Sequence, residues 1–190
     1  MEMIKLKTKY LYCFLAPSGA GKDVVTSELC KKYGFSKIPS YTTRPQRVND
    51  PNDTYNHVFV NQQEFDNIKS NLFCYDHYDG NDYGATEQQA EDYNFYVVNA
   101  SGIRWYKKEY NGNIKIKVIF LDVDESTRKV RMMNRGDSWK QINKRLLTDS
   151  SEFKNAKELA DVIIPNDFFN TCVNDVYSYI CKCEGWENES

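Results

Sequence analysis

The sequence has little histidine and no long apolar segment. Two histidines among 190 residues argue against a zinc site. No apolar run approaches the roughly 18–20 residues that a membrane-spanning helix needs. The short apolar stretch over residues 10–17 runs directly into a glycine-rich segment, so it indicates a buried strand rather than a signal peptide. We therefore expect no membrane partner.

A strong excess of either charge is also missing. The 25 lysines and arginines nearly balance the 27 aspartates and glutamates, for a formal net charge of −2. A dedicated duplex-DNA binder usually carries a basic stripe and a high pI, so we expect no nucleic-acid partner. Hydrophobic residues (41%) and aromatics (14%) suffice for a packed core. The length predicts one domain, and we expect a monomer or a homodimer.

Cysteines are few and scattered, at positions 13, 30, 74, 172, 181 and 183. A chain of this size folds without disulfides, which favours a reduced, cytoplasmic protein. Cys181 and Cys183 are close enough to suggest a metal site, but no second ligand pair follows, so this signal is weak.

Strand and helix patterns alternate along most of the chain. The β-rich runs cover residues 10–15, 36–41, 95–98, 114–123 and 161–164. The helical patterns cover residues 23–33, 103–108, 125–134, 139–157 and 168–183. Such alternation predicts βαβ units and a mostly parallel sheet. We expect the acidic tail over residues 184–190 to fray.

The segment over residues 41–91 interrupts this alternation, so we interpret it as an inserted subdomain. A polar loop is expected over residues 42–56. Asn61 and Thr86 each begin a capping-box pattern for a helix. A strand over residues 72–78 ends at the turn signal Asp79-Gly80.

The strongest motif is APSGAGKD at residues 16–23, between a predicted strand and a predicted helix. Gly19 and Gly21 let backbone N–H groups turn toward a phosphate, and the helix N-terminus adds a favourable dipole. Lys22 supplies a positive charge to the β- and γ-phosphates. A glycine-rich turn without a ligand is the alternative, and it leaves Lys22 unexplained. The predicted ATP-binding residues of this loop are Ser18, Gly19, Ala20, Gly21, Lys22 and Asp23.

Asp23 stands at the loop position where serine or threonine normally binds Mg²⁺. A carboxylate is also a hard oxygen ligand, so Asp23 can take over the metal. The alternative is a degraded loop, because the carboxylate adds negative charge beside the triphosphate. We favour a rebuilt metal shell around Asp23, since Gly19, Gly21 and Lys22 are all present.

Four further motifs follow in order: SYTTRPQR at 40–47, GNDYG at 80–84, NRG at 134–136 and IPND at 164–167. With these motifs and the phosphate loop, the chain resembles the guanylate kinase family over about residues 10–179. The resemblance implies an α/β fold, with a three-layer P-loop kinase core around a five-stranded parallel sheet. It also implies transfer of the γ-phosphoryl group of ATP to GMP, with Mg²⁺ as cofactor.

The resemblance divides residues 1–190, as a single domain, into three parts. The core comprises residues 1–39 and 92–190, and the mixed α+β insert that binds the nucleoside monophosphate comprises residues 40–91. The helical lid covers about residues 132–150.

Single residues also acquire roles through the resemblance. Arg44, Arg47 and Tyr83 bind the phosphate of the monophosphate, and Ser40 lies near the guanine. The residues implied for the lid and the ATP side are Arg131, Arg135, Arg145 and Asn166. The implied catalytic residues are Lys22, Arg44, Arg135 and Arg145.

The arginines suit this chemistry, because phosphoryl transfer depends on positioning and charge neutralisation. A guanidinium also binds phosphate oxygens in a bidentate way. For Arg44 and Arg47 the alternative is that they are solvated loop charges. For Arg128, Lys129 and Arg131 the solvent face of an amphipathic helix is an equal alternative.

The positions that read the base depart from the family pattern. Cys74 stands where the family has a glutamate that accepts hydrogen bonds from guanine, and Ala85 replaces a serine or threonine. Val97 and Asn99 replace two aspartates of the next core strand. Asp76 lies two residues from Cys74 on the same strand face. It either takes over from the missing glutamate or is an exposed strand carboxylate.

His57 takes the place of a family tyrosine. If the alignment is shifted by one or two residues, Tyr55 takes that place instead. The predicted contacts to the nucleoside monophosphate are therefore Ser40, Arg44, Arg47, His57, Asp76, Tyr83 and Asn99.

The function we predict is ATP-dependent phosphorylation of GMP or dGMP to the diphosphate. One alternative is a kinase for a different or modified base. The other is a catalytically weak guanylate-kinase-like binding module, since a fold alone does not establish activity. Lys22, Gly19 and Gly21 argue against the binding module, because binding of a protein ligand does not need them.

Overall fold

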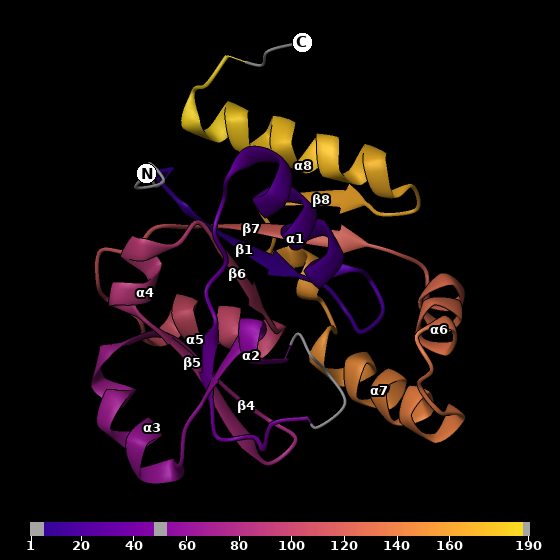
Figure 1. Ribbon diagram of the computed structural model, residues 1–190, viewed down its shortest axis with the longest axis horizontal. Helices are drawn as coiled ribbons and strands as arrows, with labels where there is room; N and C mark the ends of the chain where they lie inside the picture. Colours follow the sequence, from indigo (N-terminus) through magenta and orange to yellow (C-terminus); the bar gives the residue numbers. More distant parts are fainter. Residues whose placement is uncertain (1–5, 48–52, 188–190) are drawn as a thin grey trace.

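The computed structural model describes residues 6–47 and 53–187, and a parallel sheet lies at its centre. This sheet, sheet A, has the strand order β6-β1-β7-β8 (Figure 1). Its strands are β1 (Leu11–Leu15), β6 (Phe95–Val98), β7 (Ile116–Asp122) and β8 (Val162–Pro165). All three strand pairs are parallel, so the α/β class predicted from the sequence is confirmed.

Side chains of β1 alternate between two hydrophobic cores, which makes sheet A the middle layer. Tyr12 packs in the core shared with α1 (Lys22–Tyr33) and α8 (Phe169–Glu184). Cys13 packs in the core on the other face, with α5 (Ala100–Glu109). Successive strand residues point to opposite faces, so a strand buried on both faces is apolar throughout.

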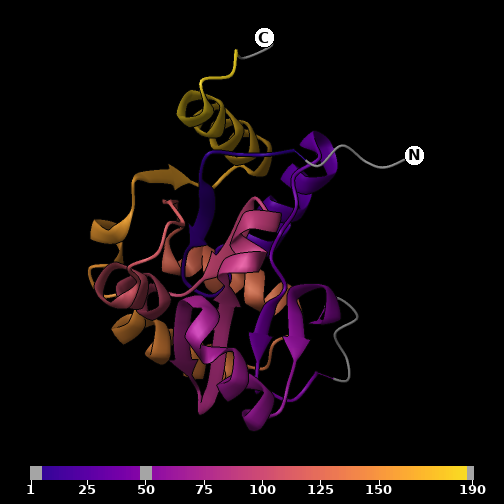
Figure 2. The same cartoon turned by 90° about the vertical axis from the view of Figure 1, so that its left-hand side faces the viewer.

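A second, mixed sheet lies at the far end of the molecule from α8 (Figure 2). Sheet B has the order β3-β2-β5-β4, with β2 and β3 parallel and the other pairs antiparallel. Its strands are β2 (Ser40–Thr42), β3 (His57–Phe59), β4 (Leu72–Tyr78) and β5 (Asn81–Thr86). Its helical segments are α2 (Asp53–Asn56), α3 (Gln62–Ile68), the 3₁₀ turn η1 (Lys69–Asn71) and α4 (Glu87–Asp92).

Local signals of the insert are confirmed in detail. Asn61 and Thr86 form the capping boxes of α3 and α4, each closed by reciprocal hydrogen bonds. Asp79 and Gly80 both have positive φ, 49° and 77°, as a tight turn between β4 and β5 requires.

Two helices follow β7 on the side toward which the strands of sheet A point (Figure 1). They are α6 (Glu125–Asn134), capped by Asp124, and α7 (Trp139–Glu152), capped by Ser138. The 3₁₀ turn η2 (Ala156–Leu159) leads from α7 to β8.

The sheet expected to have five strands has four in the part of the chain that the structure describes. In the predicted strand over residues 36–41, only Lys37 pairs with sheet A, through an isolated bridge to Phe95. The chain then leaves sheet A, because Ser40 already belongs to sheet B.

Other boundaries also differ from the predictions. The loop expected over residues 42–56 ends in α2, while residues 48–52 of that loop lie outside the described residues. The helix expected over residues 139–157 stops at Glu152. The predicted tail begins too early, because Glu184 is buried in α8 and accepts a hydrogen bond from the Tyr12 hydroxyl at 2.6 Å. Residues 188–190 lie outside the described part.

All six cysteines are free, and His, Cys, Asp and Glu side chains form no cluster of three or more among the described residues that could hold a metal. Within residues 6–47 and 53–187, none of the helices combines the length and the apolar character that crossing a membrane requires.

Candidate active site

The candidate site lies at the carboxyl ends of the sheet A strands. The phosphate loop follows β1, Asn99 follows β6, and Asn166 follows β8. Open parallel sheets bind ligands at this edge, because helix N-termini and loops meet there.

Two glycines shape the phosphate loop. Gly19 (φ +78°) and Gly21 (φ +92°) have left-handed backbone conformations. A Cβ atom on Gly19 would lie 2.8 Å from the carbonyl oxygen of Arg128, and one on Gly21 would lie 2.9 Å from Nδ2 of Asn166. The loop therefore needs glycine at both positions for conformation and for space.

Lys22 lies within the loop that precedes it. Its ammonium donates to the carbonyl oxygen of Ala16 and lies 3.4 Å from that of Pro17. Burial lowers the pKa of Lys22, whereas the nearby carboxylates of Asp23 and Asp149 act to raise it. The amine is thus held by carbonyl oxygens of the loop itself.

Arg131 and Asn166 close the loop from the side. Nη2 of Arg131 donates to the carbonyl oxygen of Asn166 at 2.7 Å, and Nδ2 of Asn166 donates to that of Ala20 at 2.7 Å. For Arg131, the solvent-face interpretation is therefore wrong. The solvent-face interpretation holds for Lys129, which pairs with Glu125 on the same helix and has a partly exposed side chain.

Asp23 projects from the first turn of α1 and its side chain is 61% exposed. One carboxylate oxygen lies 3.1 Å from the Lys37 ammonium, which also donates to Asn56. The donor chemistry fits Mg²⁺, which is usually held by one or two carboxylates together with substrate phosphates and water.

Asp53 organises the two insert arginines. Its two oxygens accept from Nη1 and Nη2 of Arg44 at 3.0 and 2.6 Å, and one also accepts from the backbone N–H of Arg47 at 2.8 Å. Burial acts to raise the pKa of Asp53, but these hydrogen bonds lower it to about 2. For Arg44, the solvated-loop interpretation is wrong, because its side chain is mostly buried.

His57, rather than Tyr55, belongs to this region. Nδ1 of His57 lies 2.9 Å from the hydroxyl of Ser40, and its ring centroid lies 6.0 Å from that of Tyr83. Tyr55 is 77% exposed. Burial and the neighbouring Arg44 lower the pKa of His57 to about 4, so the ring is neutral at pH 7.

Two arginines of the α6–α7 region, Arg135 and Arg145, lie at the carboxylate of Asp137. Nε of Arg135 donates to Asp137 at 3.2 Å, and Nε of Arg145 lies 3.7 Å from the same carboxylate. Hydrogen bonding to Arg135 is the main cause that lowers the pKa of Asp137, and the charges of Arg145 and Arg47 add to it. Two predicted phosphate-binding side chains thus lie at one anion.

The positions predicted to read the base lie in the second core instead of lining an open surface. Cys74 and Ala85 are both buried there, and the Cys74 thiol donates to the carbonyl oxygen of Gly102 at 3.2 Å. Asp76 is 6% exposed, so the alternative of an exposed strand carboxylate is wrong. Nδ2 of Asn99 donates to Oδ2 of Asp76 at 2.9 Å.

A single hydroxyl joins Asp76 to Glu152 at the end of α7. Oγ of Ser101 lies 2.6 Å from Oδ1 of Asp76 and 2.7 Å from Oε1 of Glu152. Because a serine hydroxyl carries one proton, Ser101 donates to only one of the two carboxylates at a time. Burial raises the pKa of Asp76, as does the charge of Glu152, although the bonds from Ser101 and Asn99 oppose this.

Sequence reasoning missed the partners that hold the predicted residues. They are Asp53, Ser101, Asp137, Asp149 and Glu152. Two local cues were available: Asp53 lies nine positions from Arg44, and Asp137 lies two positions from Arg135. Ser101, Asp149 and Glu152 approach from separate elements, and no spacing rule indicates them.

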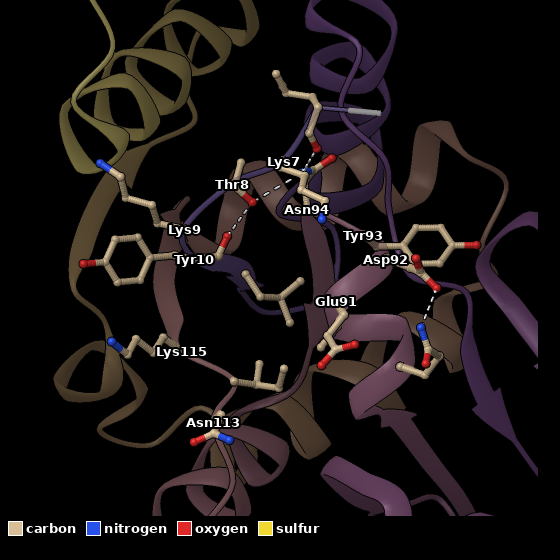
Figure 3. A pocket seen from close by; sticks show the side chains of 15 residues that line it. Lys7, Thr8, Lys9, Tyr10, Glu91, Asp92, Tyr93, Asn94, Asn113 and Lys115 are labelled. Carbon is tan, nitrogen blue, oxygen red and sulfur yellow. Dashed lines mark hydrogen bonds between the residues drawn. The ribbon is translucent and has the colours of Figure 1, made fainter. Parts of the chain in front are cut away.

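A cavity of about 430 Å³ lies at the opposite edge of sheet A (Figure 3). Its walls come from segments that precede β1, β6 and β7, including Tyr10, Asn94 and Lys115. Figure 3 shows the amino groups of Lys9 and Lys115 directed away from it. Its position at the amino ends of the strands separates it from the phosphate loop.

Known proteins resemble this chain over most of its length. A sequence model described as guanylate kinase matches residues 8–183. A guanylate kinase of Pseudoalteromonas translucida (strain TAC 125) is 30% identical over 178 residues, which cover 90% of this chain and 85% of that protein. One of Shewanella sp. (strain MR-7) is 32% identical over 181 residues, covering 90% and 86%.

The fold is also similar to a solved structure. The crystal structure of guanylate kinase from Anaplasma phagocytophilum superposes with a TM-score of 0.68 at 19% identity, covering 94% of this chain and 88% of that one. With the family match over residues 8–183 and the phosphate loop in place, this chain belongs to the guanylate kinase family.

Proposed function

We propose that this protein transfers the γ-phosphoryl group of ATP to GMP or dGMP. The observation that carries the proposal is that two groups of arginines are each held at one carboxylate: Arg135 and Arg145 at Asp137, and the Arg44 guanidinium with the Arg47 backbone N–H at Asp53. Arg47 comes from the insert, and Arg135 and Arg145 come from the segment around α6 and α7. A phosphoryl group passing between two nucleotides needs cations from both sides.

Each side has a distinct task. Ser18, Gly19, Ala20, Gly21 and Lys22 hold the ATP phosphates, with Arg131 and Asn166 beside them. Arg44, Arg47, Tyr83 and His57 hold the acceptor phosphate, and Ser40, Asp76 and Asn99 face the base. Closure of the lid over about residues 132–150 onto the insert over residues 40–91 excludes water from the remaining core.

Guanylate kinases use ATP as the phosphoryl donor, and Mg²⁺ is their usual cofactor. Asp23 is the residue that would hold the ion in this chain. When bound, Mg²⁺ neutralises charge on the β- and γ-phosphate oxygens. The acceptor phosphate is itself the nucleophile, so the chain needs no catalytic serine, cysteine or histidine.

Base selection rests on Asp76 in this proposal. Both of its oxygens are already bonded, to Asn99 and Ser101, so guanine binding exchanges one of these bonds for a donor of the base. We further propose a monomer or homodimer in the cytoplasm that does not bind nucleic acid. Six free cysteines agree with a reducing compartment.

An assay of ADP release tests the proposal. The purified protein is given ATP, Mg²⁺ and, separately, the ribo- and deoxyribonucleoside monophosphates of each base. We expect turnover with GMP and dGMP and none with AMP, CMP or UMP. Turnover with a different base, or no turnover with any acceptor, would overturn the proposal.

A further inference from the structure

Asp149 of α7 places its carboxylate directly against the phosphate loop. The backbone N–H of Ser18 donates to Oδ2 at 2.8 Å, and the Ser18 hydroxyl lies 3.2 Å from Oδ1. Asp149 is only 6% exposed. Backbone N–H groups of such a loop are the donors that bind phosphate oxygens. A carboxylate of the chain itself therefore occupies a position suited to a phosphate.

Arg128 of α6 completes this arrangement. Nη1 of Arg128 lies 3.2 Å from Oδ2 of Asp149 and 3.2 Å from the carbonyl oxygen of Ser18. Arg128 is 8% exposed, and its Nε has no hydrogen-bond partner among the described residues. A buried, unpaired donor is costly. A terminal phosphate offers three oxygens where a carboxylate offers two, so it can satisfy one more donor.

We propose that Asp149 is an internal substitute for a phosphate group of ATP, and that Arg128 is an additional phosphate-binding residue. ATP binding then requires Asp149 to leave Ser18, because two anions cannot share the same donors. The guanidinium of Arg128 donates to the incoming phosphate in place of the carboxylate. This inference rests on the proposed function, since its ligand is the donor nucleotide.

A purely structural role for the pair makes different predictions. If Arg128 and Asp149 only join α6 and α7 to the core, loss of either side chain weakens ATP binding or leaves it unchanged. If Asp149 competes with a phosphate, its loss strengthens ATP binding, while loss of Arg128 weakens it. The two variants therefore move ATP affinity in opposite directions only in the second case.

Equilibrium binding of ATP without an acceptor provides the test. We expect Asp149→Asn to bind ATP about tenfold more tightly, because one charge-assisted hydrogen bond no longer opposes the ligand. Arg128→Met should bind about tenfold more weakly. Both should bind adenosine, which has no phosphate, like the unmodified protein. Asp175→Asn, an exposed aspartate of α8, is the control for the same change in net charge and should leave ATP affinity unchanged. Unchanged or weaker ATP binding by Asp149→Asn overturns the proposal.

A measurement on the unmodified protein covers the case in which a variant does not fold. The Nε–H resonance of Arg128 and the amide resonance of Ser18 are followed by NMR during titration with inorganic tripolyphosphate. We expect both to shift on saturation, and an unshifted Arg128 resonance contradicts the proposal. The GMP assay is independent of these experiments. If the protein does not phosphorylate GMP, but Asp149→Asn binds ATP more tightly and Arg128→Met binds it more weakly, only the proposed function is refuted.

Discussion

The proposed phosphate-binding region and the proposed base-reading region are built from different kinds of groups. Around the phosphates, the chain uses backbone N–H groups, two glycines and cationic side chains, as with Gly19, Gly21 and Lys22. In the proposed base-reading region, Cys74 and Ala85 are packed in a hydrophobic core. The polar groups there are a short network of Asp76, Asn99, Ser101 and Glu152.

The difference reflects what each ligand demands. A phosphate is recognised by charge and by donors that any backbone supplies, so we expect the loop to tolerate the exchange of a hydroxyl for the carboxylate of Asp23. A base is recognised by a few buried polar groups whose pairing must be complete. We propose that Asp76 replaces the group missing at Cys74. Asp76 lies on the same face of β4, since both side chains approach Gly102.

The largest expected effect concerns the phosphate side. Lys22→Met should lower turnover with ATP and GMP by about 100-fold or more, because a preorganised charge beside the transferring group is lost. Steady-state kinetics at saturating ATP measures this. Lys32→Met, at the other end of α1 where the amine donates to Asn174, is the matched control. Full activity of Lys22→Met would show that the donor binds elsewhere.

A second, smaller effect is expected at the acceptor phosphate. Arg44→Lys keeps the charge but loses the planar fork that binds Asp53 and a phosphate in a bidentate way. We expect KM for GMP to rise about tenfold, with a lesser change in kcat and in KM for ATP. Arg104→Lys is the control, because the Arg104 side chain donates to the carbonyl oxygens of residues 152 and 154. Equal changes in both KM values would contradict the separation of the two phosphate sites.

The base-reading region is tested by selectivity rather than by rate. Asp76→Asn should reduce the preference for GMP over IMP, which lacks the 2-amino group, by about tenfold in kcat/KM. The competing nucleotides are compared in one reaction mixture. Asp66→Asn, an exposed aspartate of α3 in the same insert, is expected to keep the preference. An unaltered ratio in Asp76→Asn would remove Asp76 from base recognition.

The smallest effect is a pH dependence of stability. His57 has a folded-state pKa of about 4, below its usual value, so the unfolded chain binds more protons between pH 4 and 6.5. The contribution of neutral His57 to the free energy of unfolding is therefore fully present above pH 6.5, and it is lost as the pH falls toward 4. We expect a loss of about 1 kcal/mol in the free energy of unfolding from this group.

Urea titrations at pH 7 and pH 4.5 measure this loss. The difference between pH values should be smaller in His57→Gln than in His77→Gln, the matched variant of the second histidine, which has a mostly exposed side chain. The same pH dependence in both variants would assign the effect to other groups.

Local signals in the sequence were sufficient for much of the fold. The apolar run of β1, the capping boxes at Asn61 and Thr86 and the turn at Asp79 depend on neighbours within a few residues. The phosphate loop belongs to the same class, because its glycines act on their own backbone. These features were predictable because each is complete within one segment.

The strand over residues 36–41 and the environment of Arg128 were not predictable in this way. A strand pattern does not say which sheet it joins, and the chain at Ser40 joins sheet B. An arginine on an amphipathic helix is exposed unless another element covers it, and α7 covers Arg128 with Asp149.

The sequence by itself therefore determined the α/β class, the phosphate loop and the family. The tertiary structure alone decided which side chains meet there. Asp149 lies 131 positions from Ser18, and Glu152 lies 51 positions from Ser101. Such contacts depend on how α7 packs against the core, and packing is a property of the whole chain rather than of any local pattern.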